Sequence, residues 1–245
     1  MLVVGLTGGI ASGKSTVSGL LKTKHHIPII DADVIAREVL EPGTSCHKAV
    51  VAHFGSSILL PSSDRIDRTA LGSLIFKSPT DRAFLNSVTH PAVRREMLRQ
   101  LIKYWLKGKR MVVLDVPLLI EAKLDRFVGE VVVVYVDEDV QLERLMKREP
   151  IPPNKPLTLE QAKDRIQSQL PLKEKISKAD HILDNSTTPS SLSTSVDALV
   201  VTLLEKSGKF PSWRLCWIFP PLGLWLACWR VGRKWMNARN REAKL

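Results

Sequence analysis

Cysteine is scarce in this sequence of 245 residues, and the few cysteines present are placed without pattern. Cys46, Cys216 and Cys228 are odd in number, widely separated, and form no C-x-x-C pair. This excludes a disulfide framework and a zinc-ribbon type of site, and it favours a reducing compartment. The six histidines are also scattered, so no metal-ligand cluster is expected. No signal peptide is expected either, because a phosphate-binding motif occupies the segment where one would lie.

Acidic residues are too few to balance the basic ones, and the formal net charge is +11. The excess is local. Residues 206–245 carry nine Lys/Arg and one acidic residue, a net +8, whereas the first 205 residues carry 27 and 24, a net +3. An enzyme that binds nucleic acid would carry a basic stripe on the domain itself. We therefore expect no nucleic-acid partner.

The sequence also lacks an apolar run of the roughly 20 residues that a membrane-spanning helix needs. Residues 215–229 are fifteen uncharged residues, interrupted by Pro220-Pro221, and five of the six tryptophans lie from Trp213 onward. Tryptophans flanked by arginines suit the membrane–water interface. We expect membrane association through residues 213–235, with packing on the domain or an oligomer contact as the alternative.

The last three residues, Ala-Lys-Leu, differ by one small residue from the peroxisomal address Ser-Lys-Leu. The expected location is therefore cytoplasmic or peroxisomal, with attachment to a membrane through the tryptophan-rich segment. Neither the composition nor the motifs predict an oligomeric state.

What the sequence does contain, almost at its start, is GLTGGIASGKST, which fits the phosphate-binding pattern G-x-x-x-x-G-K-[ST]. Glycines let the backbone wrap around an anion, and the helix that follows directs its positive dipole end to the same charge. Lys14 would reach the β- and γ-phosphates of ATP, and the Ser15 hydroxyl would ligate Mg²⁺. The predicted ATP-binding residues are Gly8, Gly9, Ile10, Ala11, Ser12, Gly13, Lys14, Ser15 and Thr16.

Short apolar segments alternate with amphipathic ones along the chain, which predicts strands separated by helices. The predicted strands lie at residues 2–4, 27–33, 110–119, 129–137 and 179–186. The predicted helices cover residues 16–24, 34–41, 46–54, 69–77, 79–108 with a break at Pro91, 140–149, 158–170 with Thr158 as its cap, and a last one ending near Lys206. Continuously apolar strands between helices indicate a parallel sheet covered on both faces. The predicted fold class is α/β, with the three-layer α/β/α core of the P-loop nucleoside-triphosphate hydrolases.

Aspartates end three of these strands, at the sheet edge where such folds bind ligands: Asp31 and Asp33, Asp115, and Asp137. Asp33 precedes a helix, so its carboxylate would lie beside the phosphate loop and accept the proton of an acceptor hydroxyl. The alternative is that Asp33 caps the helix, and the two roles are compatible. Asp115 ends the strand VVLD, a pattern that holds Mg²⁺ or its waters.

Arg144 and Arg148 lie one helical turn apart on a predicted helix, and Arg165 follows on the next one. Phosphoryl transfer needs cations on the developing charge, which a closing lid can deliver. We therefore assign Arg144 and Arg148 to a lid. The alternative is a solvated helix face on which these arginines pair with Glu143 and Glu149.

Together, the segments GLTGGIASGKST, DADVIAR, IDRTALG, THPAVR, DVPLLIE, QLERLMKRE, DRIQSQLPLKEK and ADHILDNS resemble the dephospho-CoA kinases. The resemblance covers about residues 1–206. It implies ATP-dependent phosphorylation of the ribose 3′-hydroxyl of dephospho-CoA, on a nucleotide core with a helical substrate-binding region and a lid. The family's catalytic aspartate falls on Asp33, and its lid arginines match Arg144 and Arg148. Its substrate-side residues fall on Arg68, His90, and the segment from Leu118 to Glu121.

The resemblance divides the chain into a kinase domain, residues 1–206, and a tryptophan-rich basic extension, residues 207–245. Two departures from the family pattern stand out: several extra residues with four prolines in the lid loop near residues 149–162, and Ile120 where phenylalanine is common. Two alternatives stay open. One is a P-loop kinase acting on nucleosides or nucleoside monophosphates, and the other is a membrane-tethered nucleotide-binding scaffold without activity.

Overall fold

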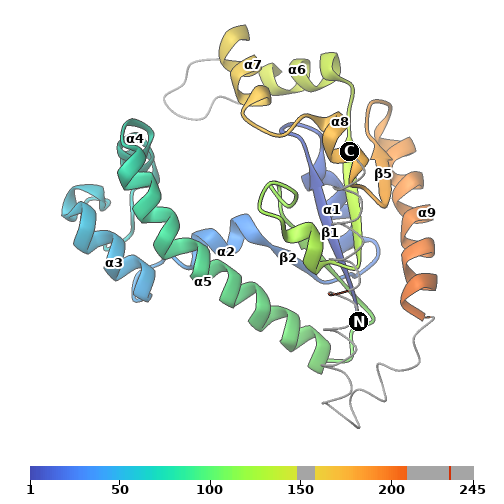
Figure 1. The fold of residues 1–245 in the computed structure, drawn as a ribbon, viewed down its shortest axis with the longest axis horizontal. Coiled ribbons are helices and arrows are strands. Elements are labelled where there is room, and N and C mark those ends of the chain that lie inside the picture. Colours follow the sequence, from blue (N-terminus) through green and yellow to red (C-terminus); the bar gives the residue numbers. More distant parts are fainter. Residues whose placement is uncertain (148–157, 209–231, 233–245) are drawn as a thin grey trace. The chain divides into compact units, whose positions relative to one another are not determined.

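The computed structural model describes residues 1–147, 158–208 and 232 of the chain. The fold divides into two compact units, here called the core unit (residues 1–29 and 107–245) and the helical unit (residues 30–106) (Figure 1). The predictions for Arg148 and for the tryptophan-rich segment lie outside the described residues. Within the described part of the chain, no helix combines the length and apolarity that crossing a bilayer requires.

A five-stranded sheet, with strand order β2-β3-β1-β4-β5, forms the centre of the fold. The strands are β1 (Leu2–Gly8), β2 (Ile29–Asp31), β3 (Met111–Asp115), β4 (Glu130–Tyr135) and β5 (His181–Asp184). The central strand β1 pairs in parallel with both β3 and β4, and β4 pairs in parallel with β5. These pairings confirm the predicted parallel sheet. They also bring the carboxyl ends of β1, β3 and β4 to one edge.

Helices cover this sheet because its strands are apolar on both sides. Helices α1 (Lys14–Thr23) and α9 (Pro189–Gly208) contact each other and bury their apolar residues against the strands on one face. On the other face, Leu119 and Val128 pack over Gly5 of β1, and α8 (Leu172–Ser177) contacts β4. Helices α6 (Glu138–Lys147) and α7 (Leu159–Gln167) pack on each other (Figure 1). The core unit is thus the predicted three-layer α/β/α fold.

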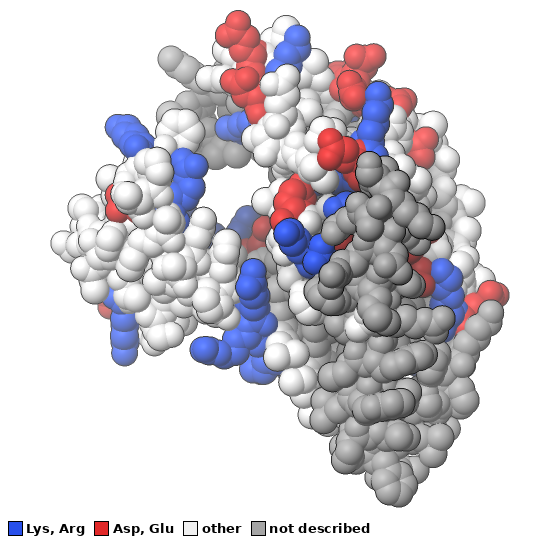
Figure 2. Space-filling view, viewed as in Figure 1, with Lys and Arg blue, Asp and Glu red and all other residues white. Residues whose placement is uncertain are grey.

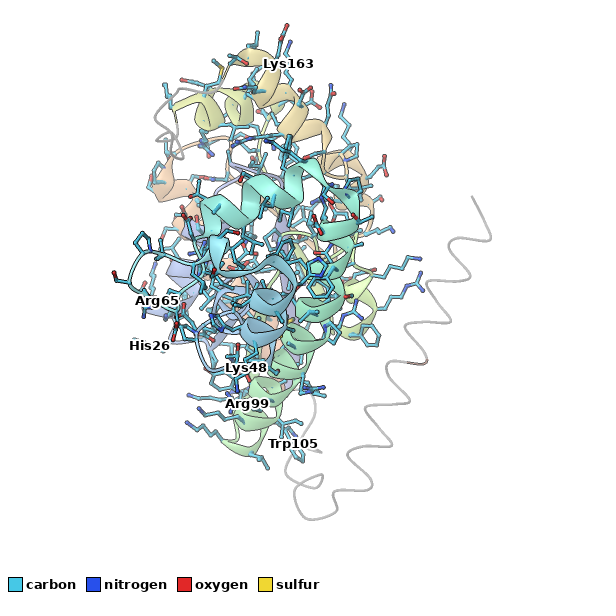
Figure 3. The ribbon with its side chains drawn as sticks, turned by 90° about the vertical axis from the view of Figure 1, so that its left-hand side faces the viewer. His26, Lys48, Arg65, Arg99, Trp105 and Lys163 are labelled. Carbon is cyan, nitrogen blue, oxygen red and sulfur yellow. The ribbon has the colours of Figure 1, made fainter. Side chains whose placement is uncertain are left out.

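The helical unit consists of α2 (Ala32–Glu38), α3 (Ser45–Phe54), a 3₁₀ turn (Ser56–Ile58), α4 (Arg68–Lys77) and α5 (Pro79–Leu106). Its small core is built from Val50, Ile58, Ile66 and Leu71, all buried. Helix α5 contacts α2, α3 and α4 and so organises the unit. Figure 3 labels Arg99 and Trp105 along α5. The Arg99 guanidinium, bonded to Glu96 one turn earlier, lowers the pKa of that carboxyl to about 2.

The predicted break at Pro91 is wrong, because α5 runs through this residue as one helix of 28 residues. Proline removes one backbone hydrogen bond, and its ring crowds the carbonyl four residues earlier, which usually kinks or ends a helix. Here α5 packs on three other helices along its length. Tertiary packing supplies most helical stability in proteins and can outweigh that local cost.

Charged side chains of both signs lie interspersed over the described surface of the core unit on the face seen in Figure 2. Helix α6 shows how such charges pair: Glu143 bonds Lys147 one turn later, and this hydrogen bond lowers the pKa of Glu143. The basic excess of the sequence falls mainly on residues 206–245, most of which lie beyond the described part of the chain.

Candidate functional site

The phosphate loop connects β1, which ends at Gly8, to α1, which begins at Lys14. Gly13 caps α1 in the left-handed conformation, with φ 87°, and Ala11 also has a positive φ of 58°. A side chain at Gly13 would meet Asn185, since its Cβ would lie 2.1 Å from Nδ2. The first N–H groups of a helix have no partners within the helix. The loop therefore presents these donors, with the positive end of the helix dipole, as an anion-binding cradle.

Three side-chain amides, which the sequence reasoning missed, hold this loop in shape. Gln141 Nε2 donates to the Ile10 carbonyl at 2.8 Å, and the Ile10 N–H donates to Gln169 Oε1 at 3.0 Å. Asn185 Nδ2 donates to the Ser12 carbonyl at 2.8 Å. Gln141 and Asn185 are both buried. The three residues lie in segments that carry the family resemblance, but no local pattern reveals their contacts with the loop, because each contact joins positions more than 130 residues apart.

Lys14, predicted to bind the phosphates, and Asp115, predicted to hold Mg²⁺, contact each other in the structure. The Lys14 ammonium forms an ion pair with the Asp115 carboxylate, which lies at the carboxyl end of β3 and is 2% exposed. The Lys14 side chain itself is 17% exposed. Ser15 and Thr16, in the first turn of α1, are exposed. Their hydroxyls can therefore reach a ligand or a metal ion held in the cradle.

A fully buried lysine lies behind the loop, and the sequence reasoning missed it as well. Lys175 Nζ, on α8, lies 2.9 Å from Glu121 Oε1 and 3.4 Å from the carbonyl oxygens of Gly8 and Pro117. The N–H of Leu170 donates to the same Glu121 oxygen at 3.2 Å. Glu121, which the family resemblance assigns to the substrate, thus holds α8 and the segment before it against the start of the phosphate loop.

Leu118 is the other residue predicted from the segment between Leu118 and Glu121. It is 45% exposed and can contact a ligand. The Pro117 carbonyl just before it also accepts from the Thr7 hydroxyl at 2.7 Å. This bond ties the segment after β3 to β1, so Leu118 lies on an anchored turn.

The predicted lid arginines fall on and beyond α6. Arg144 is half-buried on that helix, and Arg148 lies outside the described residues. Glu143, the acidic partner in the alternative, forms an ion pair with Lys147, and the nearby charge of Arg144 also contributes to lowering its pKa. Glu149, the other acidic partner in that alternative, lies outside the described residues. The predicted cap of α7 is confirmed: Thr158 accepts from the Gln161 N–H, and the Gln161 side chain accepts from the Thr158 N–H.

Asp33 lies in the first turn of α2, in the helical unit, and is exposed. The alternative reading of Asp33 as a helix cap is wrong. Asp31 is the cap: it has an extended backbone, and its Oδ1 accepts from the N–H groups of Asp33 and Val34 at 2.8 and 3.0 Å. A cap residue must precede the helical backbone, and α2 already begins at Ala32. The Asp33 carboxylate is therefore not committed to the cap.

Arg68 and His90, the other predicted acceptor-side residues, also belong to the helical unit. Arg68 begins α4, its side chain is 52% exposed, and its Nη2 lies 3.8 Å from Glu41 Oε1. His90 is exposed on α5, directly before Pro91. The predicted site residues are thus divided, with those for the nucleotide in the core unit and Asp33, Arg68 and His90 in the helical unit.

Chemically, the core unit offers backbone donors, a helix dipole and a fixed ammonium around one loop, with a buried carboxylate beside them. Such a set binds the phosphates of a nucleoside triphosphate and stabilises charge on them. In the described part of the chain, no group of three or more His, Cys, Asp or Glu side chains could hold a metal ion by itself.

Comparisons with known proteins identify the family to which this chain belongs. Residues 2–190 match the family model described as dephospho-CoA kinase. A dephospho-CoA kinase of Saccharomyces cerevisiae is 46% identical over 225 residues, which is 91% of this chain and 90% of that protein. One of Bacillus anthracis is 46% identical over 199 residues, or 81% and 96% of the two chains.

A solved structure agrees with these sequence relatives. The dephospho-CoA kinase of Campylobacter jejuni, 27% identical, superposes with a TM-score of 0.64 over 83% of this chain and 98% of its own. The family model spans the phosphate loop, Asp33, Asp115 and Arg144, all of which lie within residues 2–190. The chain therefore belongs to the dephospho-CoA kinases, the ATP-dependent phosphotransferases that catalyse the last step of coenzyme A biosynthesis.

Proposed function

We propose that this chain transfers the γ-phosphoryl group of ATP to the ribose 3′-hydroxyl of dephospho-CoA, giving ADP and coenzyme A. The observation that carries this proposal is the phosphate loop, with Lys14 anchored on buried Asp115, in a chain of this family. Such an anchor fixes the ammonium before the nucleotide arrives, so little reorganisation is needed during transfer.

Each proposed role follows from the position of the residue. Lys14 and the loop amides bind the β- and γ-phosphates. Mg²⁺, when bound, would neutralise negative charge on the phosphates. Ser15, whose hydroxyl is exposed, and Asp115, on the neighbouring strand end, would hold it together with waters. This fits the absence of a larger carboxylate cluster among the described residues, because Mg²⁺ is usually bound by one or two protein ligands plus phosphates and waters.

The acceptor side is proposed from the helical unit and from the segment after β3. Asp33 accepts the proton of the attacking hydroxyl and orients that hydroxyl toward the γ-phosphorus. Arg68 and His90, both exposed, and Leu118 with Glu121 contact dephospho-CoA. Arg144 and Arg148 supply positive charge to the transferring group.

A panel of acceptors at fixed ATP and Mg²⁺ tests the reaction. We expect ADP release and coenzyme A formation with dephospho-CoA, and at least about 100-fold lower kcat/KM with adenosine, AMP or other nucleoside monophosphates. Lys14→Ala serves as the matched control, because it removes the fixed charge from the loop and should abolish turnover on every acceptor. A preference for a nucleoside monophosphate would favour the alternative kinase. Turnover equally absent from the parent and from Lys14→Ala would favour the scaffold.

We further propose that residues 213–235 attach the enzyme to a membrane surface, in the cytoplasm or at the peroxisome. Two facts support a separate role for this segment. The Bacillus anthracis relative is matched over 96% of its length by only 81% of this chain. In addition, the five tryptophans and the basic excess are concentrated after residue 205.

Deleting residues 211–245 is expected to leave kcat within about twofold of the parent and to abolish co-sedimentation with vesicles of mixed neutral and anionic lipid. Deleting only residues 236–245 is the control, because it keeps the tryptophans and should keep most of the binding. High salt should weaken binding without eliminating it, because salt screens surface charge but not buried tryptophan area. An inactive or aggregated 211–245 deletion would show that the tryptophans pack on the domain.

A further inference from the structure

Two glutamine side chains hold one residue of the phosphate loop from both sides. The Ile10 carbonyl accepts from Gln141 Nε2 at 2.8 Å, and the Ile10 N–H donates to Gln169 Oε1 at 3.0 Å. Gln141 is 3% exposed and Gln169 is half-buried. Both backbone polar groups of Ile10 are therefore occupied by side chains and not by the loop itself.

The two glutamines come from the two arms that flank residues 148–157. Gln141 lies on α6, which ends at Lys147, and Gln169 follows α7, which ends at Gln167. The two helices pack on each other, and Figure 3 labels Lys163 on the exposed outer side of α7. Any displacement of these arms must therefore either move Ile10 or break its two hydrogen bonds.

Gly9 makes this arrangement sterically feasible. A Cβ at this position would lie 2.7 Å from Gln141 Nε2 and 3.3 Å from Leu172, closer than carbon and nitrogen atoms pack. The amide of Gln141 thus passes directly over the backbone of Gly9 to reach the next residue. Glycine is needed at this position because of a contact within the protein. The shape of the loop therefore depends on the α6 and α7 arms as well as on a bound ligand.

We propose that Gln141 and Gln169 are positioning residues that hold the phosphate loop in its nucleotide-binding shape and couple it to the α6 and α7 arms. The inference rests on the proposed function for its kinetic readout. Neither side chain is proposed to contact a reacting atom. Both act through Ile10, whose peptide groups flank the amides that receive the phosphates.

The first test replaces each glutamine with methionine, which has nearly the same length and no amide. Gln141→Met and Gln169→Met in the full chain are expected to raise KM for ATP and Kd for ADP by roughly 5- to 100-fold, the cost of leaving a buried polar group unpaired. KM for dephospho-CoA should change by less than about threefold. Gln167→Met, at the exposed end of α7, is the matched control and should change none of these constants.

A second pair of variants tests the direction of the hydrogen bonds. Gln169→Glu keeps an oxygen that can accept from the Ile10 N–H, whereas Gln141→Glu places a carboxylate against the Ile10 carbonyl. Both add one negative charge near the loop, so comparing them removes the general electrostatic effect. We expect Kd for ADP, measured by calorimetry, to be at least about fivefold higher for Gln141→Glu than for Gln169→Glu.

Equal Kd values for the two glutamate variants would overturn the proposal, as would methionine variants that match Gln167→Met. A fall in thermal stability with equal changes in all binding constants would show a structural role only and would also overturn it. ADP binding does not depend on the acceptor. If the parent fails to phosphorylate dephospho-CoA, the proposed function fails while the Kd comparison still decides this inference.

Discussion

Replacing Asp33 with asparagine is expected to lower kcat for coenzyme A formation by about 10²–10⁴-fold, the usual loss when a general base is removed. The variant keeps the size of the side chain and its hydrogen-bonding capacity but loses the negative charge that accepts the proton. Kd for ATP should stay within about twofold of the parent, because the proposed phosphate ligands lie on the loop from Gly8 to Thr16. Single-turnover measurements with saturating ATP and dephospho-CoA would separate this chemical step from product release.

Asp31→Asn is the matched control for this variant. It removes the same charge two residues earlier, at the cap of α2, whose Oδ1 accepts from the N–H groups of Asp33 and Val34. Asparagine caps helices about as well as aspartate, so α2 should persist. A kcat near that of the parent for Asp31→Asn and a large loss for Asp33→Asn would identify a role at one carboxylate. Equal losses would indicate that the general charge of this segment matters, and a small loss at Asp33 would contradict the assignment of the base.

The sequence alone is sufficient to predict the parts of the fold that depend on local pattern. The glycine spacing from Gly8 to Gly13 requires a particular loop, and the apolar segments at residues 111–115 and 130–135 form strands as predicted. Thr158 with Gln161 three residues later is a local capping pattern, and the structure confirms it. Each of these features is encoded within a few neighbouring residues, so no tertiary contact is needed to predict it.

The features that the sequence could not predict depend on contacts between distant segments. The sequence suggests Asp33 as a cap, but the backbone becomes helical already at Ala32, so Asp31 takes that place. Pro91 has a local effect that three neighbouring helices outweigh. Gln141, Gln169 and Asn185 contact the phosphate loop across more than 130 positions, and glutamine and asparagine follow no distinctive spacing.

Lys175 is the clearest example, because lysine is almost never fully buried unless it is paired. Its segment, LKEKIS, contains three charged residues, and no pattern within it indicates a buried side chain. In the structure Lys175 is 0% exposed, and its ammonium lies between the Glu121 carboxylate and the carbonyls of Gly8 and Pro117. The partner of the charge is therefore more than 50 residues away.

The ion pair between Lys175 and Glu121 predicts that removing one partner costs more stability than removing the other. Glu121→Met leaves a fully buried ammonium with only two carbonyl oxygens at 3.4 Å, so we expect a loss of about 3–5 kcal/mol in the free energy of unfolding. Lys175→Met leaves a carboxylate whose side chain is 25% exposed and which still accepts from the Leu170 N–H. Because that group can turn to water, we expect the smaller loss. Urea unfolding at neutral pH measures both values.

The double variant Lys175→Met with Glu121→Met completes a double-mutant cycle, which measures the interaction between the two side chains. Apolar replacement of a whole buried ion pair is often neutral or stabilising, so the double variant should regain most of the stability that Glu121→Met loses. Additive losses would contradict a direct interaction between the two groups. The double variant also tests whether Glu121 contacts dephospho-CoA, the role that the family resemblance gives it. If KM for dephospho-CoA stays raised by about tenfold or more when stability has returned, Glu121 contacts the acceptor as well. If KM returns to that of the parent, the carboxylate serves the buried pair alone.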